Sequence, residues 1–380
     1  MNLFDVYPLF DISIVKASGS VLWDNKGKQY LDLYGGHAVI SIGHSHPHYL
    51  KKIKEQLDQI GFYSNSIKIA PQLELAEKLG ELCGYPDYQL FLCNSGAEAN
   101  ENALKLASFH TNRKKVIAFT KSFHGRTSLA VAATDDKSIV APVNETANIQ
   151  FLPFNDETAL EKAMSQEVCA VIVEGIQGVG GVNIPTVSFL KKIEALCKQY
   201  GAIFILDEVQ SGYGRSGKFF AHQYSGVKPQ LITTAKGMGN GFPVASVLIS
   251  PEIKAKHSLL GTTFGGNYLA CAAAIAVLDV IKQEKLVDHT LQIGNNWINE
   301  LKKLKDVKEV RGQGLMIGVE LNNPCADIRK KLLTDHGIFT GSASNKNVIR
   351  LLPALNIQQH DIDAFNTAFK HVLANSAVTI

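Results

Sequence analysis

The chain has 380 residues, of which 46% are hydrophobic and 19% charged, with a formal net charge of +3. This composition excludes a mainly disordered chain, and the length suits a large domain plus a smaller one. So small a net charge gives no support to a nucleic acid or an acidic membrane surface as partner, and no apolar run is long enough to span a bilayer.

The cysteines and the first residues bear on the cellular compartment. Six cysteines are scattered along the chain and form no C-x-x-C pair. We interpret them as buried free thiols in a reducing compartment. The stretch Met1–Val6 has neither the basic nor the apolar segment of a signal peptide. We therefore expect a cytoplasmic protein.

The first 45 residues are predicted to form short strands and turns. Val21–Asp24 and Gln29–Leu33 flank a glycine turn, as in a hairpin. The segment His44–His48 follows, and three histidines at alternate positions are typical of a metal site. Pro47 disturbs the local geometry, however, and no Cys, Asp or Glu lies close by in sequence. We predict no metal here, but a turn before a helix at His48–Ile60.

Helices and strands alternate from about residue 71 to residue 210. The expected strands are Gln89–Cys93, Val116–Thr120, Cys169–Glu174 and Ala202–Leu206, and the expected helices are Leu73–Leu82, Ala97–His110 and Val187–Tyr200. This order is typical of βαβ units, in which helices cover a mostly parallel sheet. Ligands of such sheets bind beyond the carboxyl ends of the strands, so residues just after each strand are candidate site residues.

The pattern changes after about residue 266. Two long helices, at 268–284 and 288–304, precede strands at 315–321 and 348–352 and helices at 326–336 and from residue 361. We therefore predict a large domain at residues 46–265 and a smaller α+β domain built from residues 1–45 and 266–380.

Lys236 lies at the centre of the stretch Leu231–Ala245, where a predicted buried strand gives way to a loop with alternate glycines. Such glycines let a backbone approach a ligand closely. Keeping an unperturbed lysine neutral at pH 7 costs about 4.6 kcal/mol, and covalent attachment to a carbonyl cofactor removes its charge altogether. Lys236 is therefore a candidate for catalysis of the pyridoxal phosphate kind. The alternative is a strand-end lysine pointing into solvent.

Asp207 follows the most apolar predicted strand and needs a cationic partner if it is buried. A protonated pyridine nitrogen is such a partner, and an acid facing it makes the ring an electron sink. Gln210, three residues further on, could contact the hydroxyl group of the same ring.

Other strand ends carry further candidates. Gly96 and Ala97 open a predicted helix, where free backbone N–H groups bind phosphate unless the helix is simply capped. Phe123 can lie flat on a planar ring, and Arg126 can bind a carboxylate in a fork; a core Phe and a surface Arg are the alternative. Residues 261–267 offer hydroxyls and bare backbone to a phosphate. Arg350 ends an apolar strand, so we expect a substrate carboxylate or a structural salt bridge beside it.

The run Gly212–Gly217 matches the G-x-G-x-x-G pattern of dinucleotide sites. It opens no convincing helix and is followed at once by Phe219 and Phe220, so the context that such a site needs is missing. A nicotinamide-dependent dehydrogenase is the alternative from another class of enzyme, and it would lack visible absorbance.

Together, six segments resemble the class III pyridoxal-phosphate aminotransferases, in particular the acetylornithine and succinylornithine aminotransferase branch. They are residues 95–100 (SGAEAN), 123–126 (FHGR), 207–212 (DEVQSG), 235–237 (AKG), 262–267 (TTFGGN) and 349–353 (IRLLP). Their order and spacing cover nearly the whole chain. The resemblance implies the type I aminotransferase fold, the cofactor pyridoxal 5'-phosphate, and a homodimer with shared active sites.

The resemblance also implies a role for each candidate residue. Lys236 would hold the cofactor and move the proton, and Asp207 would face the pyridine nitrogen. The other cofactor contacts would be Gln210 at the ring oxygen, Phe123 on the ring face, Ser95, Gly96 and Ala97 at the phosphate, and Thr263 reaching in from the partner subunit. The substrate contacts would be Arg126 at a carboxylate, Arg350 for the acceptor, and His37.

Four positions depart from the family pattern. Val179 stands where related enzymes carry an acid that pairs with the arginine at position 350 while the amino donor is bound, and Gly175 replaces the usual proline after Glu174. Ala97 replaces a common threonine. His37 stands where ornithine aminotransferases carry a tyrosine that contacts substrate, which argues against plain ornithine.

The predicted reaction moves the terminal amino group of N-acetyl- or N-succinyl-L-ornithine to 2-oxoglutarate, as in arginine biosynthesis. The sequence does not separate the two donors, and we hypothesise that Val179 goes with the succinyl variant. Another ω-aminotransferase, acting on ornithine, lysine or 4-aminobutyrate, is an alternative. An aminomutase of the same fold, which needs no keto acid, is another.

Overall fold

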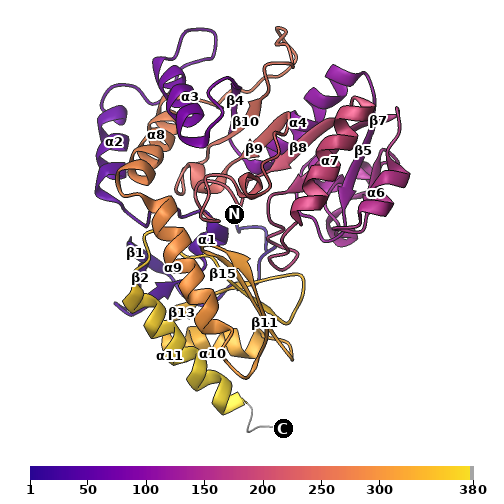
Figure 1. Ribbon diagram of the computed structural model, residues 1–380. Helices are drawn as coiled ribbons and strands as arrows, with labels where there is room; N and C mark the ends of the chain where they lie inside the picture. The colour runs from indigo at the N-terminus through magenta and orange to yellow at the C-terminus, as the bar shows by residue number, and fades with distance from the viewer. Residues whose placement is uncertain (377–380) are drawn as a thin grey trace.

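A seven-stranded sheet lies at the centre of the computed structural model, which describes residues 1–376 (Figure 1). The strand order is β4-β10-β9-β8-β7-β5-β6. β10 runs antiparallel to β4 and β9, and the other pairs are parallel. The strands are β4 (Gln89–Cys93), β5 (Lys115–Phe119), β6 (Ile149–Leu152), β7 (Val168–Glu174), β8 (Ile203–Asp207), β9 (Leu231–Thr234) and β10 (Ala245–Ile249). This mostly parallel sheet confirms the predicted α/β class.

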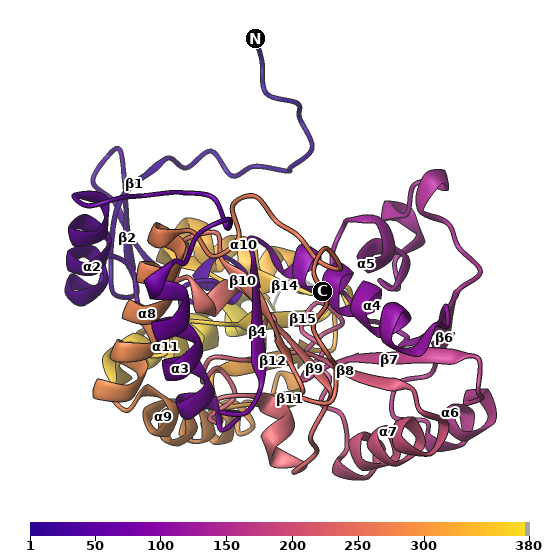
Figure 2. The same ribbon diagram turned by 90° about the horizontal axis from the view of Figure 1, so that it is seen from above.

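Both faces of the central sheet are buried under helices (Figure 2). Side chains alternate along a strand, so Ile203 and Ile205 pack on the side of α4 (Gly96–Thr111), while Phe204 and Leu206 pack on the side of α7 (Val187–Tyr200). α5 (Ser128–Ala132) lies on the first side and α6 (Glu157–Ala163) on the second. Burial on both faces explains why these strands are continuous apolar runs in the sequence.

A layer of three helices flanks the β4 edge of the sheet. α8 (Tyr268–Gln283) packs against α2 (Pro47–Leu57) and α3 (Ala70–Cys83) in one hydrophobic cluster with residues of β9 and β10. α8 is buried on nearly all sides, as expected for a helix rich in alanine and β-branched residues. It therefore packs on the central sheet although it follows residue 265, and the predicted division at that residue stays a prediction.

Two four-stranded sheets make up most of the remaining structure. One joins β1 (Ile14–Ser18), β2 (Val21–Asp24), β3 (Gln29–Asp32) and β13 (Ile338–Phe339), and the other joins β11 (Val307–Gln313), β12 (Met316–Leu321), β15 (Val348–Leu351) and β14 (Gly341–Ser342). β13 pairs in parallel with β3. The N-terminal hairpin and the C-terminal part of the chain are thus hydrogen-bonded into one unit.

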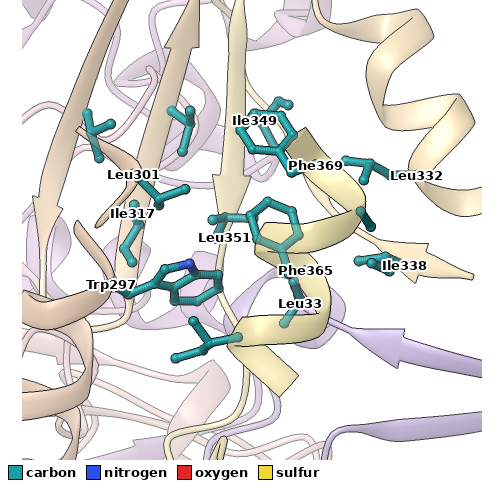
Figure 3. Close-up of a cluster of buried hydrophobic side chains, with 14 of the residues drawn as sticks. Leu33, Trp297, Leu301, Ile317, Leu332, Ile338, Ile349, Leu351, Phe365 and Phe369 are labelled. Atoms are coloured by element: carbon teal, nitrogen blue, oxygen red, sulfur yellow. The ribbon is translucent and has the colours of Figure 1, made fainter. Parts of the chain in front are cut away.

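The core of this second unit is aromatic and aliphatic (Figure 3). Trp297 of α9 (Leu286–Leu301) meets Phe365 of α11 (Gln359–Ser376) edge to face, with ring centroids 5.6 Å apart. Leu332 of α10 (Ala326–His336) and the inner residues of β12 and β15 complete the cluster. The predicted helices and strands of this part are confirmed, each within a few residues.

The three histidines around the start of α2 each contact a different carboxylate. His44 bonds Asp32 at 2.9 Å, His46 bonds Glu284 at 2.9 Å, and His48 bonds Asp279 at 3.2 Å. They tie the predicted turn to β3 and to the C-terminal end of α8. α2 begins at Pro47, one residue before its expected start.

The N-terminal end extends away from the rest of the chain (Figure 2), whereas Phe10 meets Phe339 edge to face, with ring centroids 6.4 Å apart. The N-terminal end presents apolar side chains to solvent, among them Leu3, Phe4 and Leu9. Across residues 1–376, no helix has both the length and the apolar character needed to cross a bilayer.

Candidate active site

The ends of several central strands surround a cavity of about 420 Å³. Most of the predicted site residues line it: Ser95, Gly96, Ala97, Phe123, Arg126, Asp207, Gln210 and Lys236. The other three, Thr263, Arg350 and His37, do not. The cavity lies where a parallel sheet is expected to bind a ligand, just beyond the carboxyl ends of its strands.

Lys236 lies just after β9 and has a φ of 46°. This left-handed conformation is uncommon for a residue other than glycine. Desolvation lowers the pKa of Lys236 to about 8; Asp207 opposes this shift, Arg350 adds to it and Glu174 opposes it. The neutral amine at pH 7 therefore costs about 1.4 kcal/mol, against about 4.6 kcal/mol for an unperturbed lysine. Because its neutral form costs little free energy, the Lys236 amine can act as a nucleophile or a base.

Asp207 ends β8 and is almost completely buried. Its Oδ2 accepts hydrogen bonds from Asn100 Nδ2 at 2.8 Å and from His124 Nδ1 at 2.7 Å. Its Oδ1 accepts one from the Val209 backbone N–H at 3.0 Å. Three donors on fixed elements thus hold the carboxylate at the wall of the cavity.

Asn100 and His124 contact Asp207, and the sequence did not single them out. Asn100 Nδ2 also donates to the His124 carbonyl at 2.7 Å, and Thr233 Oγ1 donates to Asn100 Oδ1 at 2.7 Å. Both lie within segments that the resemblance covers. The signal available was their place in segments that follow strand ends, but only the fold shows that both reach Asp207.

Glu174 at the end of β7 is a third residue without a predicted role. It lines the cavity, and its carboxylate accepts hydrogen bonds from the backbone N–H groups of Phe123 and Gly178, each at 3.0 Å. Desolvation raises the pKa of Glu174 to about 7, His124 opposes the shift, and Asp207 adds to it. Glu174 therefore connects Phe123, which lines the cavity, to the loop that follows β7.

The start of α4 forms one end of the cavity. Ser95 caps the helix, because its Oγ accepts from the Glu98 N–H at 3.2 Å. The N–H groups of the first turn, at Gly96 and Ala97, have no acceptor within the helix and are suited to an anion. A Cβ atom at Gly96 would lie 2.7 Å from Val209 Cγ1, so only glycine fits there without a shift.

Arg350 contacts the cavity wall through Gln210. Its Nη1 donates to Gln210 Oε1 at 3.3 Å and its Nε to the Ser342 carbonyl at 2.5 Å. Burial lowers the pKa of Arg350, and within residues 1–376 no carboxylate forms a salt bridge with it. The structural salt bridge considered as an alternative is therefore not present, and the guanidinium stays available to an anion.

His37 and Thr263 lie at the periphery. Gln210 Nε2 donates to the His37 carbonyl at 3.1 Å, and the exposed His37 ring bonds the Tyr34 hydroxyl. Thr263 is exposed and does not line the cavity of its own chain. The predicted roles of both residues stay predictions.

The Gly212–Gly217 run forms turns, and no helix begins there. Arg215 inside it is buried and donates to the carbonyls of Leu315 at 3.3 Å, Ile40 at 3.3 Å and Pro353. The run thus joins the central sheet to the second unit of the structure, and the helix that a dinucleotide site requires is missing.

The comparison with known families decides the identity. The family model described as "Aminotransferase class-III" matches residues 5–373. The chain belongs to the class III aminotransferases. This confirms the resemblance, and with it a transaminase that depends on pyridoxal phosphate.

Several relatives of this aminotransferase are similar over their whole length. The acetylornithine aminotransferase of Archaeoglobus fulgidus is 40% identical over 95% of this chain and 96% of its own. That of Bacillus subtilis is 40% identical over 98% of each chain. Among solved structures, an ornithine aminotransferase of Toxoplasma gondii aligns with a TM-score of 0.93 at 28% identity, over 100% of this chain and 94% of that one. The type I fold is confirmed.

The residues of this class III site fit pyridoxal phosphate. The cavity brings together an amine of lowered pKa, a buried carboxylate that forms no salt bridge with a Lys or Arg of residues 1–376, and the free N–H groups at the start of α4. Lys236, Asp207, Gly96 and Ala97 would hold the cofactor. When bound, it supplies an aldehyde and a cationic ring that withdraws electrons.

Proposed function

We propose that this aminotransferase moves the terminal amino group of N-acetyl-L-ornithine or N-succinyl-L-ornithine to 2-oxoglutarate. The products are N-acyl-L-glutamate 5-semialdehyde and L-glutamate, in a step of arginine biosynthesis. The observation that carries the proposal is the cavity with Lys236 and Asp207 in its wall, in a chain about 40% identical over nearly its full length to relatives named acetylornithine aminotransferase.

Different residues around the cavity serve in proton transfer, substrate binding and cofactor contact. The Lys236 amine, with its lowered pKa, takes a proton from the substrate carbon and returns it. Arg126 on the cavity wall binds a substrate carboxylate in a fork, and Arg350 serves the acceptor acid through its guanidinium face. Phe123 and Gln210 line the same cavity; Phe123 would lie against the cofactor ring, and Gln210 would contact its oxygen.

The specificity of the enzyme depends on which acyl group, acetyl or succinyl, the donor carries. Val179 lines the cavity and is half-buried, so its side chain offers an apolar surface where an acid would offer a charge. We propose that this altered pocket goes with the succinyl donor. A donor comparison in which kcat/KM strongly favours N-acetyl-L-ornithine would remove this part of the proposal.

We further propose a homodimer whose active sites are shared. Phe264, next to Thr263, is 59% exposed, and its ring centroid lies 5.3 Å from that of the exposed Phe62. Exposed aromatic pairs of this kind mark interaction surfaces, and the adjacent Thr263 would reach the partner's cofactor. We place the dimer in the cytoplasm, which suits six free, buried cysteines.

A substrate panel tests the reaction directly. The purified protein is assayed with each N-acylornithine, ornithine, lysine and 4-aminobutyrate, with and without 2-oxoglutarate. Acylornithine turnover that requires 2-oxoglutarate supports the proposal. Preference for ornithine would favour the reading suggested by the structurally similar ornithine aminotransferases, and turnover without a keto acid would indicate an aminomutase.

A further inference from the structure

The loop after β7 closes one side of the cavity and is held in an unfavourable conformation. Gln177 and Asn183 pair as an isolated antiparallel bridge, and the segment between them is called here the Gln177–Asn183 hairpin. Within it Val182, a buried β-branched residue, has a φ of 60°, which its side chain strongly disfavours. Such a backbone persists only when the surrounding structure fixes it.

The hairpin is held from two sides. Glu174 accepts from the Gly178 N–H at 3.0 Å and Gln177 Nε2 donates to the Thr120 carbonyl at 2.8 Å, while the contact to Gly181 comes from the second unit of the structure. Arg311 of β11 donates from Nε to the Gly181 carbonyl at 2.8 Å. Its Nη1 is held in turn by Glu320 at 2.7 Å and by Glu309 at 2.8 Å. The side chain of Glu320 is largely buried, whereas that of Glu309 is about half exposed. Arg311 is therefore a fixed donor aimed at the hairpin.

The hairpin is connected in turn to Arg350. Ser344 donates its N–H to the Val179 carbonyl at 2.9 Å, and two residues earlier the Ser342 carbonyl accepts from Arg350 Nε at 2.5 Å. Val179 itself lines the cavity. A shift of the hairpin would thus move both the cavity wall at Val179 and the segment that orients the Arg350 guanidinium.

We propose that Arg311 is a positioning residue for the acceptor half of the reaction. It holds the strained hairpin through the Gly181 carbonyl, and the hairpin sets the place of residues 342–344 and so of Arg350. This inference rests on the proposed function for the role of Arg350. It predicts that losing the Arg311–Gly181 bond weakens the binding of 2-oxoglutarate more than that of the amino donor.

The test compares R311A and R311K with E309Q as the matched control. R311K retains a charge for Glu320, which preserves folding, but cannot also reproduce the fork that reaches Gly181. E309Q removes only the charge of the half-exposed partner. For both Arg311 variants we expect the amide exchange rate in a peptide covering residues 177–183 to rise about tenfold or more. We also expect the KM for 2-oxoglutarate to rise about tenfold, while the KM for the amino donor changes little. E309Q should match the unmodified protein.

Two results would overturn the inference. One is an R311K variant whose amide exchange rate in the hairpin and whose KM for 2-oxoglutarate both equal those of the unmodified protein. The other is an equal loss for both substrates with raised exchange throughout β11 and β12, which indicates general loosening. The exchange measurement needs no turnover, so it remains valid even if the enzyme does not use the proposed donors. In that case the affinity for glutarate, measured by absorbance titration of the holoenzyme, replaces the KM comparison.

Discussion

Replacing Gly96 by alanine is expected to weaken cofactor binding, because the new methyl group has no room. It would lie 2.7 Å from Val209 Cγ1 and 3.1 Å from Val209 Cγ2. Ordinary contact begins at 3.4 Å, so one group must move by the difference between 3.4 and 2.7 Å, about 0.7 Å. Val209 also donates its N–H to Asp207, so the shift reaches the carboxylate proposed to face the cofactor ring.

The size of the effect follows from two opposing terms. Overpacking of this kind costs about 1–3 kcal/mol, while alanine in place of a helical glycine gains up to about 1 kcal/mol. The apoprotein should therefore lose between about 0 and about 3 kcal/mol of stability. The Kd for pyridoxal phosphate should rise between about fivefold and about 150-fold, since about 1.4 kcal/mol corresponds to a tenfold change.

A double-mutant cycle tests the reasoning. In V209A the nearest remaining atom of residue 209, its Cβ, would lie 3.5 Å from the new methyl group, so G96A should have almost no effect in that background. G61A is the matched control, since its methyl group meets only the tip of Leu269. Additive effects of G96A and V209A on the Kd, measured by fluorescence titration, would refute the explanation.

Four further outcomes are expected. K236A should lose the visible absorbance of the holoenzyme and borohydride labelling at position 236; labelling that persists would contradict the role of Lys236. E174Q should flatten the pH dependence of stability, because the pKa of Glu174 is raised to about 7 in the folded chain. The protonated side chain contributes fully below about pH 4.5, and about 3 kcal/mol of that contribution is lost as the pH rises to 7. If the unfolding free energy of E174Q, measured with urea, changed with pH as steeply as that of the unmodified protein, this explanation would be contradicted. R215M should leave two buried carbonyls and one partly buried carbonyl without the Arg215 donor, and lower stability by about 3 kcal/mol. An unchanged melting temperature would be inconsistent with the observed bonds. Removal of residues 1–12 should loosen the proposed dimer, which sedimentation measures, and a dimer constant equal to that of the full chain would exclude the segment from the interface.

Much of the fold could be predicted because its signals are local. The strands at Val168–Glu174 and Ile203–Asp207 are unbroken apolar runs, and α7 ends at Gly201 in the left-handed conformation that the sequence indicates. β10 was not predicted, because it follows a glycine-rich loop and its antiparallel pairing depends on distant partners. β1 carries mostly exposed residues, so it gives no apolar pattern.

The candidate site was predictable wherever the type of a residue and its position after a strand indicate its chemical role, as for Lys236 and Asp207. It was not predictable where a role depends on distance. Nothing local indicates that Asn100 and His124 meet at Asp207 Oδ2, or that Gln210 contacts Arg350. These contacts join residues that are far apart in the chain, so only the folded arrangement reveals them.

The parallel pairing of β13 with β3 constrains how the chain can be made. Leu31 leaves the ribosome among the first residues, yet its partner Ile338 comes near the end of synthesis. The central sheet, complete by residue 249, can assemble while translation continues. The N-terminal hairpin must wait with one edge open, so the earliest segment to emerge is among the last to reach its final neighbours.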